Sequence, residues 1–133
     1  MPKLRNKTIR IKKQDDAQFQ KIKIWTESMN LVSDSYKLTR TFPDFEKFGL
    51  VSQMNRCAVS IPSNIAEGSS KSTNKHFNKY LEDSLGSSFE WETQLIIAFN
   101  ESYLSEEKFK ELEQKIKSIQ KMISSFQSGL NKS

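Results

Sequence analysis

The sequence has little of what builds sheets, disulfides or membrane spans. Its 133 residues include four Gly, three Pro and one Cys, and no Asn-Gly or Asp-Gly pair marks a β-hairpin. The single Cys57 excludes an internal disulfide, which suits a reducing compartment. No window approaches the roughly 18 apolar residues that span a bilayer, and residues 1–13 lack the apolar run of a secretion signal. We therefore expect a single-domain, cytoplasmic protein that does not enter membranes.

Positive charge is concentrated at the start of the chain. Residues 14–133 hold 15 Lys and Arg against 16 Asp and Glu, so the formal charge of +5 comes from the first residues. We expect residues 1–14 to form a flexible basic arm that adds affinity for phosphate backbones. Two alternatives stay open: a tail that only aids solubility, and a short edge strand through Ile9 and Ile11. The basic residues of the arm are Lys3, Arg5, Lys7, Arg10, Lys12 and Lys13.

Apolar residues recur at alternating steps of three and four along four stretches, the pattern of amphipathic helices that pack nearly parallel. These stretches predict helices over 17–40, 45–67, 74–102 and 106–128. Short connections force neighbouring helices to run antiparallel. The predicted fold is all-α: an up-down-up-down antiparallel four-helix bundle over residues 15–130.

The first and fourth helices have the clearest apolar rows. For the fourth, Ser105 is the expected N-cap, and Leu104 and Phe109 occupy hydrophobic-staple positions. The row predicted for the first helix is Ile22, Trp25, Met29, Val32 and Tyr36, and that for the fourth is Phe109, Leu112, Ile116, Ile119, Ile123, Phe126 and Leu130.

The second and third helices carry Gly and Pro at informative places. We expect Pro62 to kink the second helix without dividing it, and Gly68 to end it as a left-handed C-cap. Ser72 or Thr73 can cap the third helix. Gly86 stands among serines in mid-helix, and close approach of another helix would offset its cost. The predicted buried residues are Leu50, Met54, Cys57, Ala58, Ile61 and Ile65, then Phe77, Leu81, Leu85, Ser88, Trp91 or Glu92, Leu95 and Phe99.

A polar stripe on the second helix is the first candidate site. Its residues recur at steps of three and four, and polar residues of the third helix can meet them. The neighbourhood of Arg56, Glu67 and Glu90 could be catalytic, but no nucleophile–base pair accompanies it. A hydrogen-bonded network that fixes the register of helices or subunits is the favoured interpretation. The set is Gln53, Arg56, Ser60, Asn64 and Glu67, with Glu90, Glu92 and Gln94.

Metal and cysteine chemistry have little support. His76 is the only His, and the Glu-x-x-His pair of di-iron bundles does not occur. Cys57 falls on the apolar face of its helix, where it reads as a small core residue rather than a nucleophile. We expect no metal, no cofactor and no catalytic residue.

Lysines at the start of the third helix form the second candidate site. Lys71, Lys75 and Lys79 recur every four residues beside His76. A helix N-terminus attracts anions, so these lysines suggest a phosphate-binding patch. A solvated lysine row is the plainer alternative, unless an oligomer repeats the patch.

Some aromatic residues exceed what one narrow core can bury. Trp91, Phe45, Phe48 and Phe89 do not all fall on the predicted core faces. Such a surplus suggests surface that is buried between subunits, and we expect a homo-oligomer.

Residues 48–68 read FGLVSQMNRCAVSIPSNIAEG, and residues 85–95 read LGSSFEWETQL. Together with Trp25 and Phe42-Pro43, these segments resemble the bacterial four-helix-bundle family of 23S rRNA intervening-sequence proteins, which is related to the accessory protein of diversity-generating retroelements. The match covers most of residues 20–126. The Ser-Ile-Pro-Ser-Asn-Ile-Ala-Glu-Gly string is the most specific part, and the basic arm is not part of the pattern.

The resemblance implies a homopentamer with a central channel and no enzymatic activity. For the retroelement relatives it also implies binding of nucleic acid and of a reverse transcriptase. The leading hypothesis is thus an oligomeric scaffold that binds RNA weakly through its arm and lysines. The alternatives are a protein-interaction module without a nucleic-acid role and, remotely, a small enzyme that uses the Arg56 neighbourhood.

Overall fold

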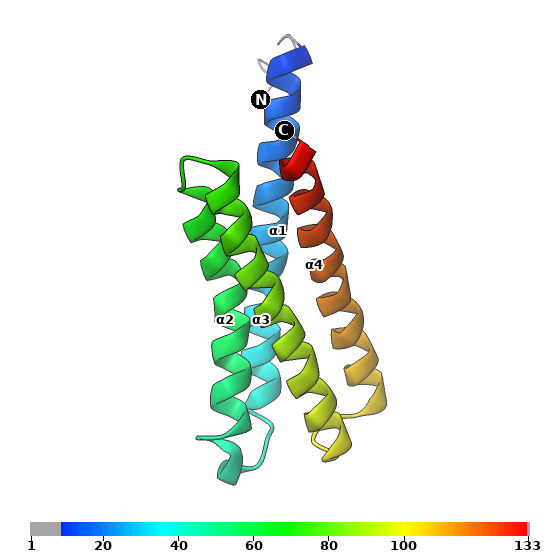
Figure 1. Cartoon of the computed structure of the whole chain (residues 1–133). Coiled ribbons are helices and arrows are strands. Elements are labelled where there is room, and N and C mark those ends of the chain that lie inside the picture. Colours follow the sequence, from blue (N-terminus) through cyan, green and yellow to red (C-terminus); the bar gives the residue numbers. More distant parts are fainter. Residues whose placement is uncertain (1–8, 133) are drawn as a thin grey trace.

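The computed structural model describes the backbone of residues 9–132 and the side chains of residues 16–131. Within that range it contains four α-helices, a 3-10 turn and no strand, so the all-α prediction is confirmed. Figure 1 shows the helices side by side in one bundle, with consecutive helices joined at alternating ends. None of the described helices has an apolar stretch long enough to cross a membrane. The elements are α1 (Ile9–Thr39), η2 (Asp44–Glu46), α2 (Leu50–Ser69), α3 (Asn74–Asn100) and α4 (Glu106–Lys132).

Helix α1 begins at Ile9, well before the predicted residue 17. The part of the predicted arm within the described range is therefore helical, and the edge strand through Ile9 and Ile11 is wrong. Residues 9–16 contain neither Gly nor Pro, so nothing in this segment interrupts a helix. The first turns of α1 extend beyond the other helices (Figure 1). Residues 1–8, with Lys3, Arg5 and Lys7, lie outside the described residues.

The face of α1 that is buried differs from the predicted one. The predicted row is largely exposed, with Ile22 at 51% and Trp25 at 40%. Burial falls instead on a parallel row that contains two serines, Ile24, Ser28, Leu31, Ser35 and Leu38. The physical reason is size: small serines let the neighbouring helices approach, and both hydroxyls find partners.

Trp91 is completely buried, so of the two alternatives for the core row of the third helix, Trp91 and Glu92, the structure buries Trp91. Its indole N–H donates to Ser35 Oγ at 3.0 Å, and Ser35 donates to Asn55 Oδ1 at 3.0 Å. Thr39 also exchanges hydrogen bonds with Asn55. This chain of bonds links α3 to α1 and α1 to α2 in the interior. The other three aromatics of that group, Phe45, Phe48 and Phe89, are exposed.

The rows predicted for α2 and α4 form the core. Residues Met54, Ala58, Ile61 and Ile65 of α2 are buried, as are Leu112, Ile116, Ile119 and Ile123 of α4. Helix α2 runs without a break through Pro62. It begins at Leu50 rather than at residue 45, because Gly49 has non-helical angles and the Glu46 carboxylate accepts the Leu50 N–H at 3.2 Å.

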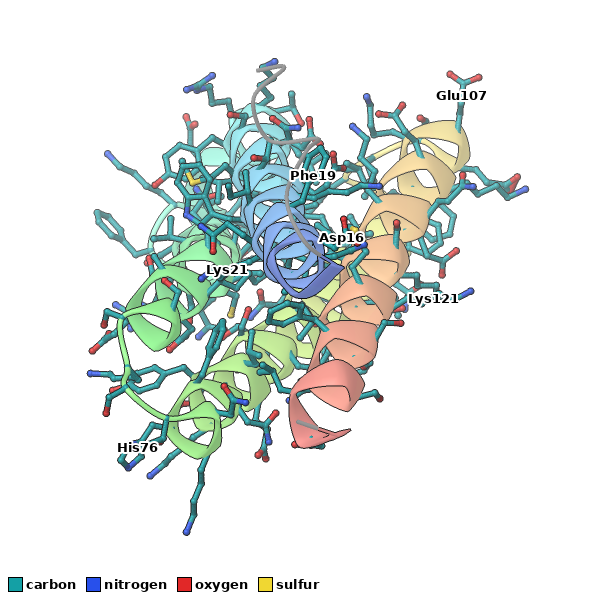
Figure 2. The ribbon with its side chains drawn as sticks, turned by 90° about the horizontal axis from the view of Figure 1, so that it is seen from above. Asp16, Phe19, Lys21, His76, Glu107 and Lys121 are labelled. Carbon is teal, nitrogen blue, oxygen red and sulfur yellow. The ribbon has the colours of Figure 1, made fainter. Side chains whose placement is uncertain are left out.

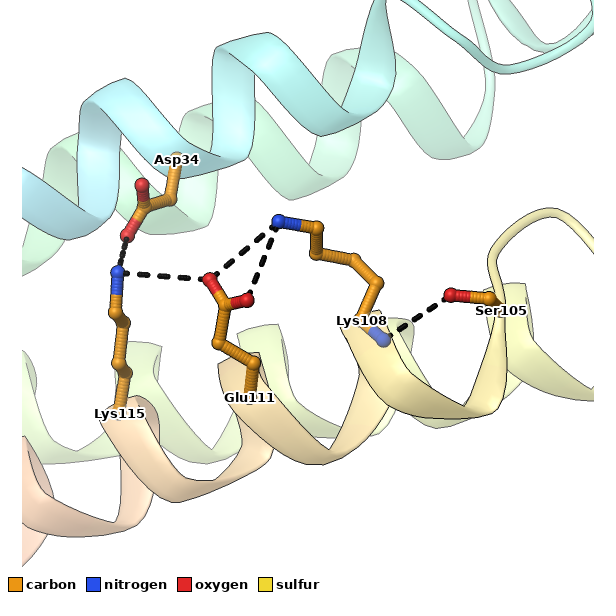
Figure 3. A network of polar contacts seen from close by, with 5 residues as sticks. All are labelled: Asp34, Ser105, Lys108, Glu111 and Lys115. Atoms are coloured by element: carbon orange, nitrogen blue, oxygen red, sulfur yellow. Dashed lines mark hydrogen bonds and ion pairs between the residues drawn. The ribbon is translucent and has the colours of Figure 1, made fainter.

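The predicted N-caps of the last two helices are confirmed. Thr73 Oγ1 accepts the His76 N–H at 3.2 Å, and Ser105 Oγ accepts the Lys108 N–H at 3.1 Å (Figure 3). These bonds satisfy two of the N–H groups that a helix start leaves without an intrahelical partner.

Gly68 does not end α2 as a left-handed cap, because it lies inside the helix and no glycine has a positive φ. Its role is close packing against α3. A Cβ at this position would lie 2.7 Å from Tyr80 Cβ and 2.9 Å from Phe77 Cδ1. Glycine therefore allows α3 to pack on the last turn of α2.

Gly68→Ala is expected to lower the free energy of unfolding by about 1–3 kcal/mol, because the added methyl overpacks against Tyr80 and Phe77. Urea denaturation followed by circular dichroism measures the change. Gly129→Ala is the matched control, since its Cβ meets nothing within 4 Å in α4. This control should raise stability by about 0.5–1 kcal/mol. Equal effects of the two substitutions would contradict the close packing.

The small residues around Gly86 divide between two sides of α3. Ser84 Oγ donates to the Ile61 carbonyl at 2.9 Å and Ser87 Oγ to Ser60 Oγ at 2.8 Å, so α2 does approach closely there. A Cβ on Gly86, by contrast, would meet nothing within 4 Å. The expectation of close approach is thus wrong for Gly86 within this chain. Its cost of about 1 kcal/mol relative to Ala has no compensating contact in the bundle.

Candidate functional site

The polar stripe of α2 is mostly absorbed into contacts between α2 and α3. Ser60 Oγ accepts hydrogen bonds from Asn64 Nδ2 and Ser87 Oγ at 2.9 and 2.8 Å. The Glu67 carboxylate accepts from the Tyr80 hydroxyl at 3.4 Å. The bonds from Ser87 to Ser60 and from Tyr80 to Glu67 join α3 to α2, which is consistent with a structural role for this part of the stripe.

Gln94 and Cys57 meet at the same contact between α2 and α3. Gln94 is buried, its Nε2 lies 3.6 Å from Cys57 Sγ, and its Oε1 has no partner among the described residues. Burial raises the pKa of the Cys57 thiol, and the Gln94 hydrogen bond offsets this only in part. A raised pKa keeps the thiol protonated at neutral pH, which is unfavourable for a nucleophile.

The neighbourhood suggested for catalysis is not assembled. Arg56, Gln53 and Glu90 are exposed, and none forms an ion pair with another described side chain. Arg56 and Glu67 stand about 16 Å apart along α2, at 1.5 Å per residue. Glu92 faces α4 instead, where it accepts a hydrogen bond from Gln120 at 2.9 Å. Within the described part of the chain, no three His, Cys, Asp or Glu residues cluster as metal ligands.

A polar network that the sequence did not suggest joins α1 to α4 (Figure 3). Lys115 Nζ lies 2.9 Å from Asp34 Oδ2 and 3.9 Å from the Glu111 carboxylate, which also pairs with Lys108. The hydrogen bond to Asp34 raises the pKa of Lys115. The network lines a groove of about 380 Å³ between the two helices. Because these side chains are partly exposed, solvent weakens their attraction.

The lysines predicted to bind anions lie at one end of the bundle. Lys71, Lys75 and Lys79 are exposed, and the Lys71 ammonium lies 5.1 Å from the centre of the Tyr80 ring. Lys75, His76 and Lys79 line a groove of about 590 Å³ between the start of α3 and the end of α4. In Figure 2, which looks onto this end, His76 points away from the bundle.

The fold brings two basic segments that are far apart in sequence to the same end. The turn between α2 and α3, which carries Lys71, lies at the end of the bundle from which the first turns of α1 project (Figure 1). Arg10, Lys12 and Lys13 occupy the first turns of α1. Sequence reasoning identified both groups of residues but could not bring them together, because their meeting depends on how the helices run.

The comparisons with known proteins agree with this architecture. The family model of the 23S rRNA-intervening sequence protein matches residues 20–125. A crystal structure from Bacteroides thetaiotaomicron VPI-5482, described as a protein with unknown function from the S23 ribosomal protein family, superposes with a TM-score of 0.76. The two are 20% identical, over 82% of this chain and 98% of the other, which shows a shared fold. No curated protein matches the chain. Since the family model covers most of its length, the chain belongs to the 23S rRNA-intervening sequence protein family.

Proposed function

We propose that this protein is a non-enzymatic, cytoplasmic scaffold that binds RNA weakly through its basic end. In this proposal the up-down-up-down antiparallel bundle assembles with copies of itself into a homopentamer. The observation that carries it is the shared position of the first turns of α1, which contain Arg10, Lys12 and Lys13, and of Lys71, Lys75 and Lys79 at one end of the bundle. An assembly that repeats this end would combine several weak patches on one surface.

The charge distribution supports a weak and salt-sensitive interaction. Six Lys or Arg residues stand among the first 13 residues without an acid, while residues 14–133 are nearly neutral. A phosphate backbone gains affinity mainly through the counterions that such side chains displace. Glu82 in the lysine groove lowers the local positive potential. We therefore expect binding without sequence preference.

A mobility-shift titration with a single-stranded RNA of about 20 nucleotides, at roughly 50 and 200 mM salt, tests the proposal. Replacing the three groove lysines, Lys71, Lys75 and Lys79, by Gln should weaken binding severalfold at low salt. Replacing the six basic residues of positions 3–13 should weaken it at least tenfold. Each lost contact should also reduce the salt slope by about 0.7.

The matched control replaces three lysines that already have acidic partners. Lys108 pairs with Glu111, Lys110 with Glu106 and Lys117 with Glu113. Because these charges are compensated, changing all three to Gln should leave RNA affinity within about twofold. Loss of binding equal to that of the groove variant would contradict a basic-end site. Absence of any shift by the wild type at low salt would contradict RNA binding altogether.

The alternative is a protein-interaction module, and one observation favours it. Phe45 in η2 and Phe48 just after it are 79% and 89% exposed, at the end of the bundle opposite the groove lysines (Figure 1). Exposed aromatics of this kind commonly anchor protein partners; a reverse transcriptase is the partner that the family resemblance implies. Recovery of a protein after nuclease treatment, and its loss in a Phe45→Ser/Phe48→Ser variant, would support this alternative. An enzymatic role has no comparable support, because Arg56, Glu67 and Glu90 do not form a common site.

A further inference from the structure

Helix α1 carries a second apolar row on its outer side. Ile22, Trp25, Met29 and Tyr36 are exposed, and Val32 between them is half-buried. The steps of three and four keep these residues on one face over about 21 Å of helix. Ile22 and Trp25 border α2, where they line a cleft with Ala66. The row has the spacing of a packed helix seam, yet within the described chain no helix covers it.

Helix α3 presents a second uncovered face. Phe89, Ile96 and Ile97 are exposed, and the seven-residue spacing of Phe89 and Ile96 places them on the same side. Each of α1 and α3 packs against α2 and α4, so the two helices occupy diagonal positions in the bundle. Figure 1 shows α3 in front and α1 behind. The two uncovered faces therefore point in opposite directions.

Gly86 lies within the exposed face of α3. It stands three residues before Phe89 and four before Glu90, and a Cβ there would meet nothing within 4 Å. A glycine in mid-helix is unfavourable without a compensating contact. Because Gly86 has no side chain and is exposed, a helix from another molecule could pack closely against it, and that contact would offset its cost.

Charge distinguishes the two faces. Helix α1 carries six basic and four acidic residues, whereas α3 carries two basic and four acidic ones. No Lys or Arg occurs between Lys79 and Lys108. The exposed acids of α3, Glu82, Asp83 and Glu90, form no ion pair with any side chain in the described range. At the other helix, Lys21 and Arg40 stand near the two ends of the apolar row.

We propose that the outer face of α1 in one copy packs on the outer face of α3 in a second copy. The apolar row of α1 covers Phe89, Ile96 and Ile97, and Gly86 is the point of closest approach. Lys21 and Arg40 stand 19 residues apart, and Glu82 and Asp83 lie at one end of the α3 face, so only the cation at the matching end of the row then faces these two acids. Packing the α3 face on itself would bring no cation to Glu82, Asp83 and Glu90, so the contact is heterologous. Because both faces belong to every copy, association continues until a ring closes. The inference rests on the proposed self-assembly and specifies its interface.

Sedimentation velocity on two variants tests the interface. Trp25→Ala/Met29→Ala alters the α1 face and leaves the α3 face unchanged, whereas Gly86→Gln alters the α3 face and leaves the α1 face unchanged. Each should weaken self-association at least tenfold, so that each variant is monomeric where the wild type assembles. Mixed in equal amounts, each variant retains the face that the other lacks, and the mixture should form heterodimers that grow no further.

Two controls separate the interface from folding. Phe19→Ala alters an exposed aromatic of α1 outside the apolar row, and Gly129→Gln alters a helical glycine with open space around it. Both should assemble as the wild type does. Gly86→Gln should keep its helical circular-dichroism signal and melt at a higher temperature as a monomer, because it removes a mid-helix glycine.

Three outcomes would overturn the interface. A wild type that stays monomeric at about 100 µM, a concentration that populates associations of micromolar affinity, is the first. The second is that Gly86→Gln assembles as the wild type does. The third is that the equal mixture of the two variants forms no heterodimers. RNA titrations of the same variants keep the two proposals distinct. If the wild type binds RNA but stays monomeric, the proposed interface is wrong and the RNA role stands. If the wild type assembles and the variants dissociate as predicted, but none binds RNA, the RNA role is wrong and the interface stands.

Discussion

Trp91→Ala should lower the free energy of unfolding by about 3–5 kcal/mol. The side chain is 0% exposed, so its removal leaves a large cavity among α1, α2 and α3. The substitution also removes the donor to Ser35 Oγ at 3.0 Å, in a network that continues to Asn55. Urea denaturation monitored by circular dichroism gives the difference in free energy.

The protein contains its own control for this substitution. Trp25 is the only other Trp, and it is 40% exposed on the outer side of α1. At a concentration low enough to dissociate any assembly, Trp25→Ala should cost about 1–2 kcal/mol, clearly less than Trp91→Ala, because only part of its side chain packs against α2. A loss for Trp25→Ala as large as that for Trp91→Ala would show that the burial assigned to α1 is wrong.

Ile116→Ala should lower the free energy of unfolding by about 2–5 kcal/mol. Ile116 is wholly buried in the middle of α4, in a row with Leu112, Ile119 and Ile123. Truncation to Ala removes three carbon atoms from this core, and the surrounding helices can relax only in part. The same denaturation measurement applies, with the slope against urea expected to stay unchanged.

Ile22→Ala is the control for Ile116→Ala, because both residues follow the three-four spacing in sequence. Ile22 is 51% exposed. Its truncation in the dissociated protein should therefore cost less than about 1 kcal/mol. If Ile22→Ala proved as destabilising as Ile116→Ala, the row predicted from the sequence of α1 would be the buried one after all.

The rows of α2 and α4 could be predicted because each has one apolar face. In α4, lysines and glutamates fill the positions beside Leu112 and Ile116, so only one orientation hides the apolar residues. Helix α1 has two candidate rows instead. Spacing favoured the one with Trp25 and Met29, whereas the structure buries the one with Ser28 and Ser35.

The candidate sites were predicted less completely than the core. Of the predicted polar stripe, Ser60, Asn64 and Glu67 form hydrogen bonds in the structure, whereas the role of the whole set stays a prediction. Whether Arg56 could reach Glu67 depends on their distance along α2, and whether it could reach Glu90 depends on how α3 is placed against α2, which the sequence does not give. The link from Lys115 to Asp34 had no signal in the sequence, because the two are 81 residues apart.

The sequence by itself determined four helices, the cap at Ser105, a cap at Ser72 or Thr73 for the third helix, and the segregation of positive charge to the start of the chain. These properties follow from local spacing and from short-range hydrogen bonds. Only the tertiary structure decided which row of α1 is buried and that two basic segments lie at the same end of the bundle. It also decided that α3 packs closely on Gly68, whereas Gly86 faces solvent. The reason is that these features depend on the close fit of one helix on another. Small residues such as serine and glycine govern that fit without contributing to a hydrophobic pattern.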